Sequence, residues 1–303
     1  MGYPQYASRY ILSQINVIKT QSLKVRKGLS AEPLHQIRVA LRKLDNAFLL
    51  FKDLIPKKNL AFWRDEIMGV SRLTSKARDL DVLIIYLNAY KKNLPHQPKK
   101  VLLNSLIASL VVKRQALQPK IVNAVDLLRK NKIIIEIEKY FIKVAQKKET
   151  RDDFKVYAVA RIKIFKRVKK VVAYRKIIHR ANEVKALHEM RIANKKLRYA
   201  LETFHKVYGR TINLYLTPVL GFHERLGKIH DYDVWIEHLE KDHKNIKKDV
   251  PEADMVDKLI VHCRKQRLIA YRSFIRFWDN YRRKYLLERL VQHVYTYRRK
   301  YEK

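Results

Sequence analysis

The sequence has few of the residues that β-rich, disulfide-bonded or zinc-binding proteins need. Its 303 residues include 6 glycines, 8 prolines and 1 cysteine. So few turn-forming residues argue against a β-sandwich and against a glycine-rich nucleotide-binding fold. The lone Cys263 excludes an intrachain disulfide framework and a zinc site built from several cysteines, and it fits a reducing cytoplasm.

Signals for export or membrane insertion are also lacking. The N-terminus has no basic segment followed by an apolar run, so we expect no signal peptide. The longest nearly apolar stretch, residues 101–112, contains Asn104, Ser105 and Ser109 and is too short to span a bilayer. We therefore expect a cytoplasmic protein that has no membrane partner.

Acidic residues are scarce relative to basic ones. The chain has 67 Lys and Arg against 29 Asp and Glu, which gives a formal net charge of +38. Hydrophobic residues make up 47% of the chain, enough to bury a core, so the sequence is not a disordered basic tail. A folded protein this basic repels itself unless it meets a polyanion, and we expect a polyanionic partner.

The apolar residues recur at steps of three and four along most of the chain, which is the spacing of an amphipathic helix. One such series runs through Leu34, Ile37, Leu41, Leu44 and Phe48. No stretch shows the sustained alternation of a strand, so we predict an all-α protein with about eight helical stretches. Helix ends are expected near residues 27–28, 56–59, 93–95, 149–150, 180–183, 208–209 and 249–252.

The two halves of the sequence resemble each other. Residues 34–40 match residues 187–193 at a shift of 153, and residues 78–82 match residues 230–234 at a shift of 152. A period of half the chain indicates a tandem duplication.

This duplication predicts the domain organisation. We expect two copies of a unit of about four helices, joined near residues 149–153. The predicted halves are residues 1–150 and residues 151–303.

The repeated segment carries a basic stripe. At about 100° per residue, His35, Arg38 and Arg42 fall on one side of a helix, beside its apolar face. The second copy places His188, Arg191, Lys195 and Tyr199 in the same way. Such stripes are usually solvated helix faces. Here, like charges at i, i+4 disfavour the helix in both copies and border the core, which indicates that an anion relieves the repulsion.

At these residues the sequence resembles the CHAD family, the conserved histidine α-helical domain. The family has a His, an Arg three residues later and further basic residues, once in each half. Other matches are the pair Arg198-Tyr199 and the Arg-Asp-x-Asp-Val element at residues 78–82. The hallmark residues are His35, Arg38, Arg42 and Lys43, then His188, Arg191, Lys195 and Lys196.

The resemblance extends over residues 5–297, with two departures. Ser75 stands where the family often has Gly, and His230 takes the place of Arg78 in the second half. The resemblance implies two four-helix bundles related by a pseudo-twofold axis. It also implies a basic groove or pore between the halves and binding of inorganic polyphosphate. Association with polyphosphate granules, a scaffolding role and a signalling role are all consistent with it.

The expected polyphosphate contacts fall into groups. The primary contacts are cations that suit phosphate through charge-assisted hydrogen bonds. His35 and His188 would be shorter-range donors that stay neutral until an anion binds, because neighbouring cations depress the pKa of a histidine. The primary group is Arg38, Arg42, Arg191, Lys195, Lys196 and Arg198, the further group Arg72, Lys76, Arg114, Arg225, Lys228 and Arg267, and Lys43, Arg78 and Tyr199 complete the set.

The paired carboxylates Asp79/Asp81 and Asp231/Asp233 could hold a metal. We favour a simpler interpretation, in which Asp79 and Asp231 cap the following helix. Neither His35 nor His188 stands in a zinc-binding motif. We therefore expect no metal, no cofactor and no catalysis.

Two alternatives remain open. A nucleic-acid-binding protein would explain the charge, although no nucleic-acid module signature is present. A metal-dependent polyphosphate-processing enzyme would use Asp79 and Asp81. The basic, aromatic run from Trp278 to Tyr301 is either an additional anion surface or a solvated helix end.

Overall fold

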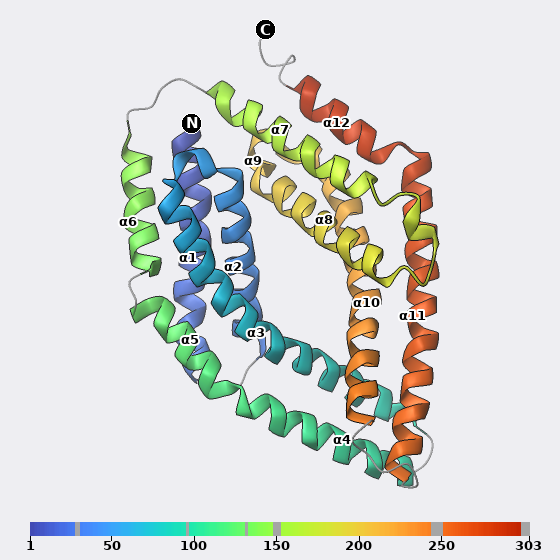
Figure 1. The fold of residues 1–303 in the computed structure, drawn as a ribbon. Helices are drawn as coiled ribbons and strands as arrows, with labels where there is room; N and C mark the ends of the chain where they lie inside the picture. Colours follow the sequence, from blue (N-terminus) through green and yellow to red (C-terminus); the bar gives the residue numbers. More distant parts are fainter. Residues whose placement is uncertain (28–30, 95–96, 131–132, 148–152, 244–250, 298–303) are drawn as a thin grey trace. The chain divides into compact units, whose positions relative to one another are not determined.

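The computed structural model of the chain describes residues 1–27, 31–94, 97–130, 133–147, 153–243 and 251–297. Every regular element in these residues is an α-helix or a short 3-10 helix, and none is a strand (Figure 1). The prediction of an all-α protein is therefore confirmed. In the same residues, no helix combines the length and the apolar character that crossing a bilayer requires.

The chain divides into two compact units, Met1–Asp153 and Phe154–Lys303. The helices of the first unit are α1 (Tyr3–Lys27), α2 (Ala31–Leu50), α3 (Lys57–Lys92), α4 (Gln97–Ala116), α5 (Gln118–Lys130) and α6 (Ile133–Gln146). The helices that follow are α7 (Asp153–Val172), α8 (Val184–Thr203), α9 (His205–Tyr208), α10 (Asn213–His243), α11 (Pro251–Arg283) and α12 (Leu286–Thr296). The 3-10 helices are η1 (Lys52–Leu54), η2 (Ile177–His179) and η3 (Gly209–Ile212).

Four helices of the first unit pack in a closed ring, α1 with α2, α2 with α3, α3 with α6, and α6 with α1. Their core is aromatic: the ring centroid of Phe48 lies 5.8 Å from that of Trp63 and 6.4 Å from that of Phe141. The Trp63 indole N–H donates to Glu136 Oε1 at 3.0 Å, so its polar atom is satisfied. Burial of this apolar face fixes the direction in which the basic edge of α2 points.

In the second unit, α10 contacts both α8 and α11. The Phe222 ring of α10 lies 5.1 Å from the Trp278 ring of α11, centroid to centroid. The Tyr271 hydroxyl donates to the carbonyl of Ile178 at 3.0 Å, which ties the segment before α8 to α11. The core-facing side of α8 is held against α10, where the Asn194 side-chain amide donates to the carbonyl of Val219 at 3.0 Å.

The carboxylate pairs do not lie at helix starts. Helix α3 runs without interruption through Asp79 and Asp81, and α10 runs through Asp231 and Asp233. The interpretation of Asp79 and Asp231 as helix caps is therefore wrong. All four carboxylates lie inside long helices, and Asp81 and Asp233 find their partners on other helices.

Most predicted helix ends that fall on described residues match the structure. Helix α3 begins at Lys57, α8 begins at Val184, and Gly209 adopts a left-handed backbone (φ 61°) after α9. The sequence did not indicate the break at Leu117 or the left-handed turn at Tyr285 (φ 51°). Four predicted helix ends include residues that the structure does not describe: those at 27–28, 93–95, 149–150 and 249–252. Arg298, Arg299 and Lys300 of the C-terminal run also lie outside the described residues.

Candidate functional site

The basic stripe of α2 faces α3. The Arg42 guanidinium donates from Nη2 to Ser75 Oγ at 3.4 Å. The pKa of His35 is lowered, first by burial and then by the positive charge of Arg78. We call His35, Arg38, Arg42 and Arg78 the first basic stripe, because two helices bring these side chains to one place.

Arg38 is the most deeply buried member of the first basic stripe. It is only 6% exposed, and its Nη1 has no hydrogen-bond partner in the part of the chain that the structure describes. Burial, with Arg42 as the next cause, lowers the pKa of Arg38 to about 10, and the attraction of Asp79 opposes this only in part. A buried, incompletely satisfied cation is energetically costly, and an anion would relieve that cost.

A buried ion pair lies beside the first basic stripe. Arg114 of α4 donates from Nε to Asp81 Oδ1 at 2.8 Å, and its Nη1 donates to Gln118 Oε1 at 3.0 Å. Arg114 is also 6% exposed, yet its charge is matched by a carboxylate. Two arginines of equal burial therefore differ in whether their charge is neutralised.

The second unit repeats this ion pair. Arg267 of α11 donates from Nε to Asp233 and from Nη1 to the carbonyl of Ala181 at 2.9 Å. Burial raises the pKa of Asp233, and the hydrogen bond from Arg267 counteracts this. The sequence identified Arg114 and Arg267 as further phosphate contacts, and the structure shows both engaged with carboxylates.

The stripe of α8 has the same design with one difference. His188 Nδ1 lies 3.2 Å from His230 Nδ1, and the two ring centroids are 4.7 Å apart. A hydrogen bond between two such nitrogens requires one to carry a proton and the other to lack it. Arg191 and Lys195 share this face, and we call these four residues the second basic stripe.

Burial and neighbouring cations keep His188 neutral in the free protein. Its pKa is lowered by burial first and then by Arg191 and Lys195, while Asp233 and Glu189 act in the opposite direction. Helices α8 and α10 are in contact at Gly227, where an added Cβ would lie at an ordinary contact distance of 4.0 Å from Arg191 Nε. The first unit has Ser75 at the matching position, and there the hydroxyl contacts Arg42.

The other predicted residues of α2 and α8 lie at the margin of the stripes. Arg198 pairs with Glu202 at 3.2 Å, and its guanidinium carbon lies 4.8 Å from the ring centroid of Tyr199. Tyr199 is buried, Lys43 is half-buried and Lys196 is exposed.

Four further predicted cations belong to α3 and α10. Arg72 is exposed and lies 3.6 Å from Asp65. Arg225 donates to the carbonyl of Gly221 at 3.2 Å and stacks 3.7 Å from the ring centroid of Phe277. The remaining two, Lys76 and Lys228, are exposed.

The described residues contain no group of three or more His, Cys, Asp or Glu side chains arranged to hold a metal ion. Asp81 and Asp233 are occupied by arginines instead. Sequence reasoning missed these two ion pairs and the His188–His230 contact. The recurrence of an Asp and an Arg 33 residues apart in the first unit and 34 apart in the second was the signal that could have revealed the pairs.

Comparisons with known proteins bear on the family and the fold of the chain. A family model described as the CHAD domain matches residues 9–240. The crystal structure of the CHAD domain from the plant Ricinus communis is 20% identical, with a TM-score of 0.68 over 91% of each chain. PptA from Streptomyces chartreusis is 15% identical, with a TM-score of 0.67 over 92% of this chain and 100% of that one. At such identities these structures show a shared fold alone, and a search of curated proteins gave no match.

Proposed function

Because the chain belongs to the CHAD family, we propose that it binds inorganic polyphosphate without turning it over. The observation that carries the proposal is Arg38, a buried guanidinium with an unsatisfied nitrogen inside a stripe that recurs in the second unit. Linear polyphosphate presents regularly spaced anionic oxygens, each of which can accept charge-assisted hydrogen bonds. Such bonds are worth roughly 1.5–3 kcal/mol each, so a few contacts per stripe give substantial affinity.

The two stripes would act together on one polymer. When one segment of a chain is bound, the next segment is held at high effective concentration near the second stripe. Binding should therefore strengthen with polymer length, up to the length that engages both units. The groove between the halves that the resemblance implies stays a prediction.

The primary contacts in this proposal are the basic members of the two stripes, supplemented by Lys196 and Arg198. Arg114 and Arg267 would act mainly by holding Asp81 and Asp233, and thereby α3 and α10, in position. The histidines would donate to phosphate oxygens and gain charge only in the complex. The remaining cations would strengthen binding through long-range attraction: the exposed Arg72, Lys76 and Lys228, and the half-buried Lys43 and Arg225.

The same geometry supports the proposal of binding without catalysis. Phosphoryl transfer to water needs a metal held by carboxylates or an activated nucleophile in addition to cations. Here Asp81 and Asp233 pair with arginines. We expect no release of phosphate from polyphosphate when magnesium is added, and magnesium-dependent release abolished by Asp79→Asn would contradict this part of the proposal.

Nucleic acid is the second polyanion to consider, because the net charge alone attracts it. The test is a competition at near-physiological salt between long polyphosphate and duplex DNA at equal phosphate concentration. The stripes predict that polyphosphate displaces a labelled polyphosphate probe at a far lower concentration than DNA does. Equal competition would favour a general polyanion-binding protein.

We further propose a cytoplasmic location, where polyphosphate granules are one place that supplies the ligand.

A further inference from the structure

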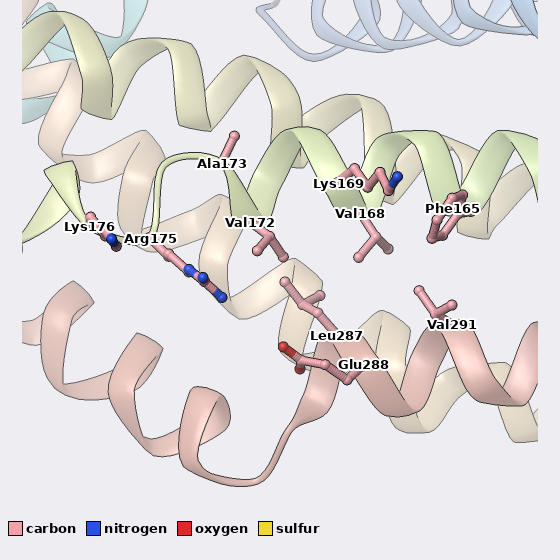
Figure 2. Close-up of a pocket in the computed structure, with 10 residues that line it drawn as sticks. All are labelled: Phe165, Val168, Lys169, Val172, Ala173, Arg175, Lys176, Leu287, Glu288 and Val291. Carbon is pink, nitrogen blue, oxygen red and sulfur yellow. The ribbon is translucent and has the colours of Figure 1, made fainter.

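A second recognition surface lies between α7 and α12, both within the second unit. The cavity there has a volume of about 700 Å³. Figure 2 shows Val168 and Val172 of α7 pointing across it toward Leu287 and Val291 of α12. These side chains, with Phe165, make an apolar floor. Such a floor offers no positive charge and no hydrogen-bond donor to a polyphosphate chain.

The cavity continues toward the turn between α11 and α12. An adjoining cavity of about 650 Å³ shares Val172 and Leu287 with the first and adds Trp278 and Tyr281. The left-handed residue Tyr285, which is 67% exposed, redirects the chain at this end. Together the two cavities form one groove along the C-terminal part of α7, apolar between α7 and α12 and of mixed character near Trp278, which we call the α7–α12 groove.

The rim of the α7–α12 groove is cationic. Lys169, Arg175 and Lys176 line it and are exposed, and Glu288 is the acidic residue that lines it. The Lys169 ammonium lies 4.6 Å from the ring centroid of Phe165, so the apolar floor and the basic rim are in direct contact. The complementary ligand has an apolar face flanked by negative charges.

The walls and length of the groove suit a helix. Both main walls are α-helices, and from Phe165 to Val172 the α7 wall is about 10 Å long, at 1.5 Å per residue. That length is about two helical turns, which present apolar side chains at positions i, i+3 or i+4, and i+7. A second copy of this chain is a poor occupant, because its net charge of +38 opposes its approach.

We propose that the α7–α12 groove binds an acidic, amphipathic α-helical segment of another protein. Apolar side chains of that helix would pack between Val172 and Val291. Its Glu or Asp residues would pair with Arg175 and Lys176 at the rim. This surface uses none of the residues in the two basic stripes, so the proposal does not rest on polyphosphate binding.

The probe is a labelled synthetic helical peptide with leucines at i, i+3 and i+7 and glutamates on the flanks, measured by fluorescence anisotropy on the full-length chain. One control peptide has the same composition in scrambled order, and another has lysine in place of glutamate. We expect saturable binding of the patterned acidic peptide and at least tenfold weaker binding of both controls. Equal binding of the scrambled peptide, or no binding of the patterned one, would overturn the proposal.

Two matched pairs of variants locate the site. Val291→Asp places a carboxylate on the floor, whereas Val261→Asp makes the same change at a 63% exposed position of α11. Lys176→Glu reverses a rim charge, whereas Lys170→Glu reverses an exposed charge of α7 that does not line the groove.

We expect Val291→Asp and Lys176→Glu each to weaken peptide binding about tenfold or more, while their partners bind as the wild type does. Polyphosphate affinity should stay unchanged in Val291→Asp, which also reports that this variant is folded. Equal effects within each pair would overturn the proposal. So would binding to anionic vesicles of phosphatidylglycerol that is lost in Val291→Asp without any binding of the peptide.

Discussion

Two arginines of equal burial should respond in opposite ways when their charge is removed. Arg38 and Arg114 are both 6% exposed, but Arg114 is paired with Asp81 and Arg38 retains an unsatisfied nitrogen. Methionine keeps an apolar stem of similar length and removes the charge. We therefore compare Arg38→Met with Arg114→Met in the full-length chain.

The magnitudes follow from the environment of each guanidinium. A pKa lowered from its ordinary value to about 10 corresponds to roughly 3 kcal/mol against the charged form of Arg38 at neutral pH, at about 1.4 kcal/mol per pKa unit. This value already includes the opposing attraction of Asp79, so Arg38→Met should leave the free energy of unfolding unchanged or raise it by up to about 3 kcal/mol. Removal of Arg114 leaves the half-buried Asp81 without its partner, which should lower the free energy of unfolding by up to about 3–5 kcal/mol.

Urea denaturation followed by circular dichroism measures both changes, with the transition midpoint compared at constant slope. Titration calorimetry then gives polyphosphate affinity under conditions where both variants are folded. Arg38→Met should bind about ten- to a hundredfold more weakly, through the loss of charge-assisted hydrogen bonds. If Arg38→Met proves as destabilised as Arg114→Met, Arg38 is a structural residue, and the argument from its unsatisfied charge fails.

Three further results are expected. Polyphosphate affinity should rise as the pH falls from about 8 to about 6, because a bound polyanion raises the lowered pKa of His188 and binding then takes up a proton. Without ligand, the free energy of unfolding should decrease below about pH 6.5, since the unfolded chain binds that proton more readily than the folded one. An affinity that is flat with pH in calorimetry would contradict a role for the histidines. The change His230→Arg, which supplies the residue found in the first unit, should raise affinity by up to about tenfold and flatten the pH profile; weaker binding would contradict it. Gly221→Ala should lower the melting temperature, equivalent to about 1–3 kcal/mol, because its Cβ would lie 2.5 Å from the Phe277 ring that stacks on Arg225; an unchanged melting temperature would show that this ring rotates away freely.

The sequence was sufficient to predict the helical class and the α2 and α8 members of the two stripes. Helical spacing and the shift of 153 residues are local or repetitive signals, which require no knowledge of tertiary contacts. The side of α2 that carries His35 and Arg38 followed directly from the position of its apolar residues. Gly209 correctly indicated a helix end, because the left-handed backbone at that position favours glycine.

Features that depend on tertiary contacts were not predicted. Asp79 and Asp81 resemble helix-capping residues, yet α3 continues through them, and the carboxylate of Asp81 finds its partner on α4. The turn at Tyr285 is left-handed without a glycine, so it leaves no signal in the composition. The α7–α12 groove depends on which face of α12 meets α7, which periodicity alone does not specify.

The central claim is that specific stripes, and not bulk charge, bind polyphosphate. The most direct test compares the double variant Arg38→Ala/Arg191→Ala with Arg9→Ala/Arg210→Ala. The second pair removes the same formal charge from exposed positions outside the stripes. Each pair contains one residue from each unit, so the number of changes per unit is also matched.

Calorimetric titration with long-chain polyphosphate at physiological salt gives the two affinities. Each lost charge-assisted hydrogen bond is worth roughly 1.5–3 kcal/mol. The polyphosphate affinity of Arg38→Ala/Arg191→Ala should therefore be at least about a hundredfold lower than that of the wild type. Arg9→Ala/Arg210→Ala should bind nearly as the wild type does, because charges beyond about 8 Å are largely screened at this salt. Equal losses in the two double variants would contradict the account and assign binding to the net charge alone.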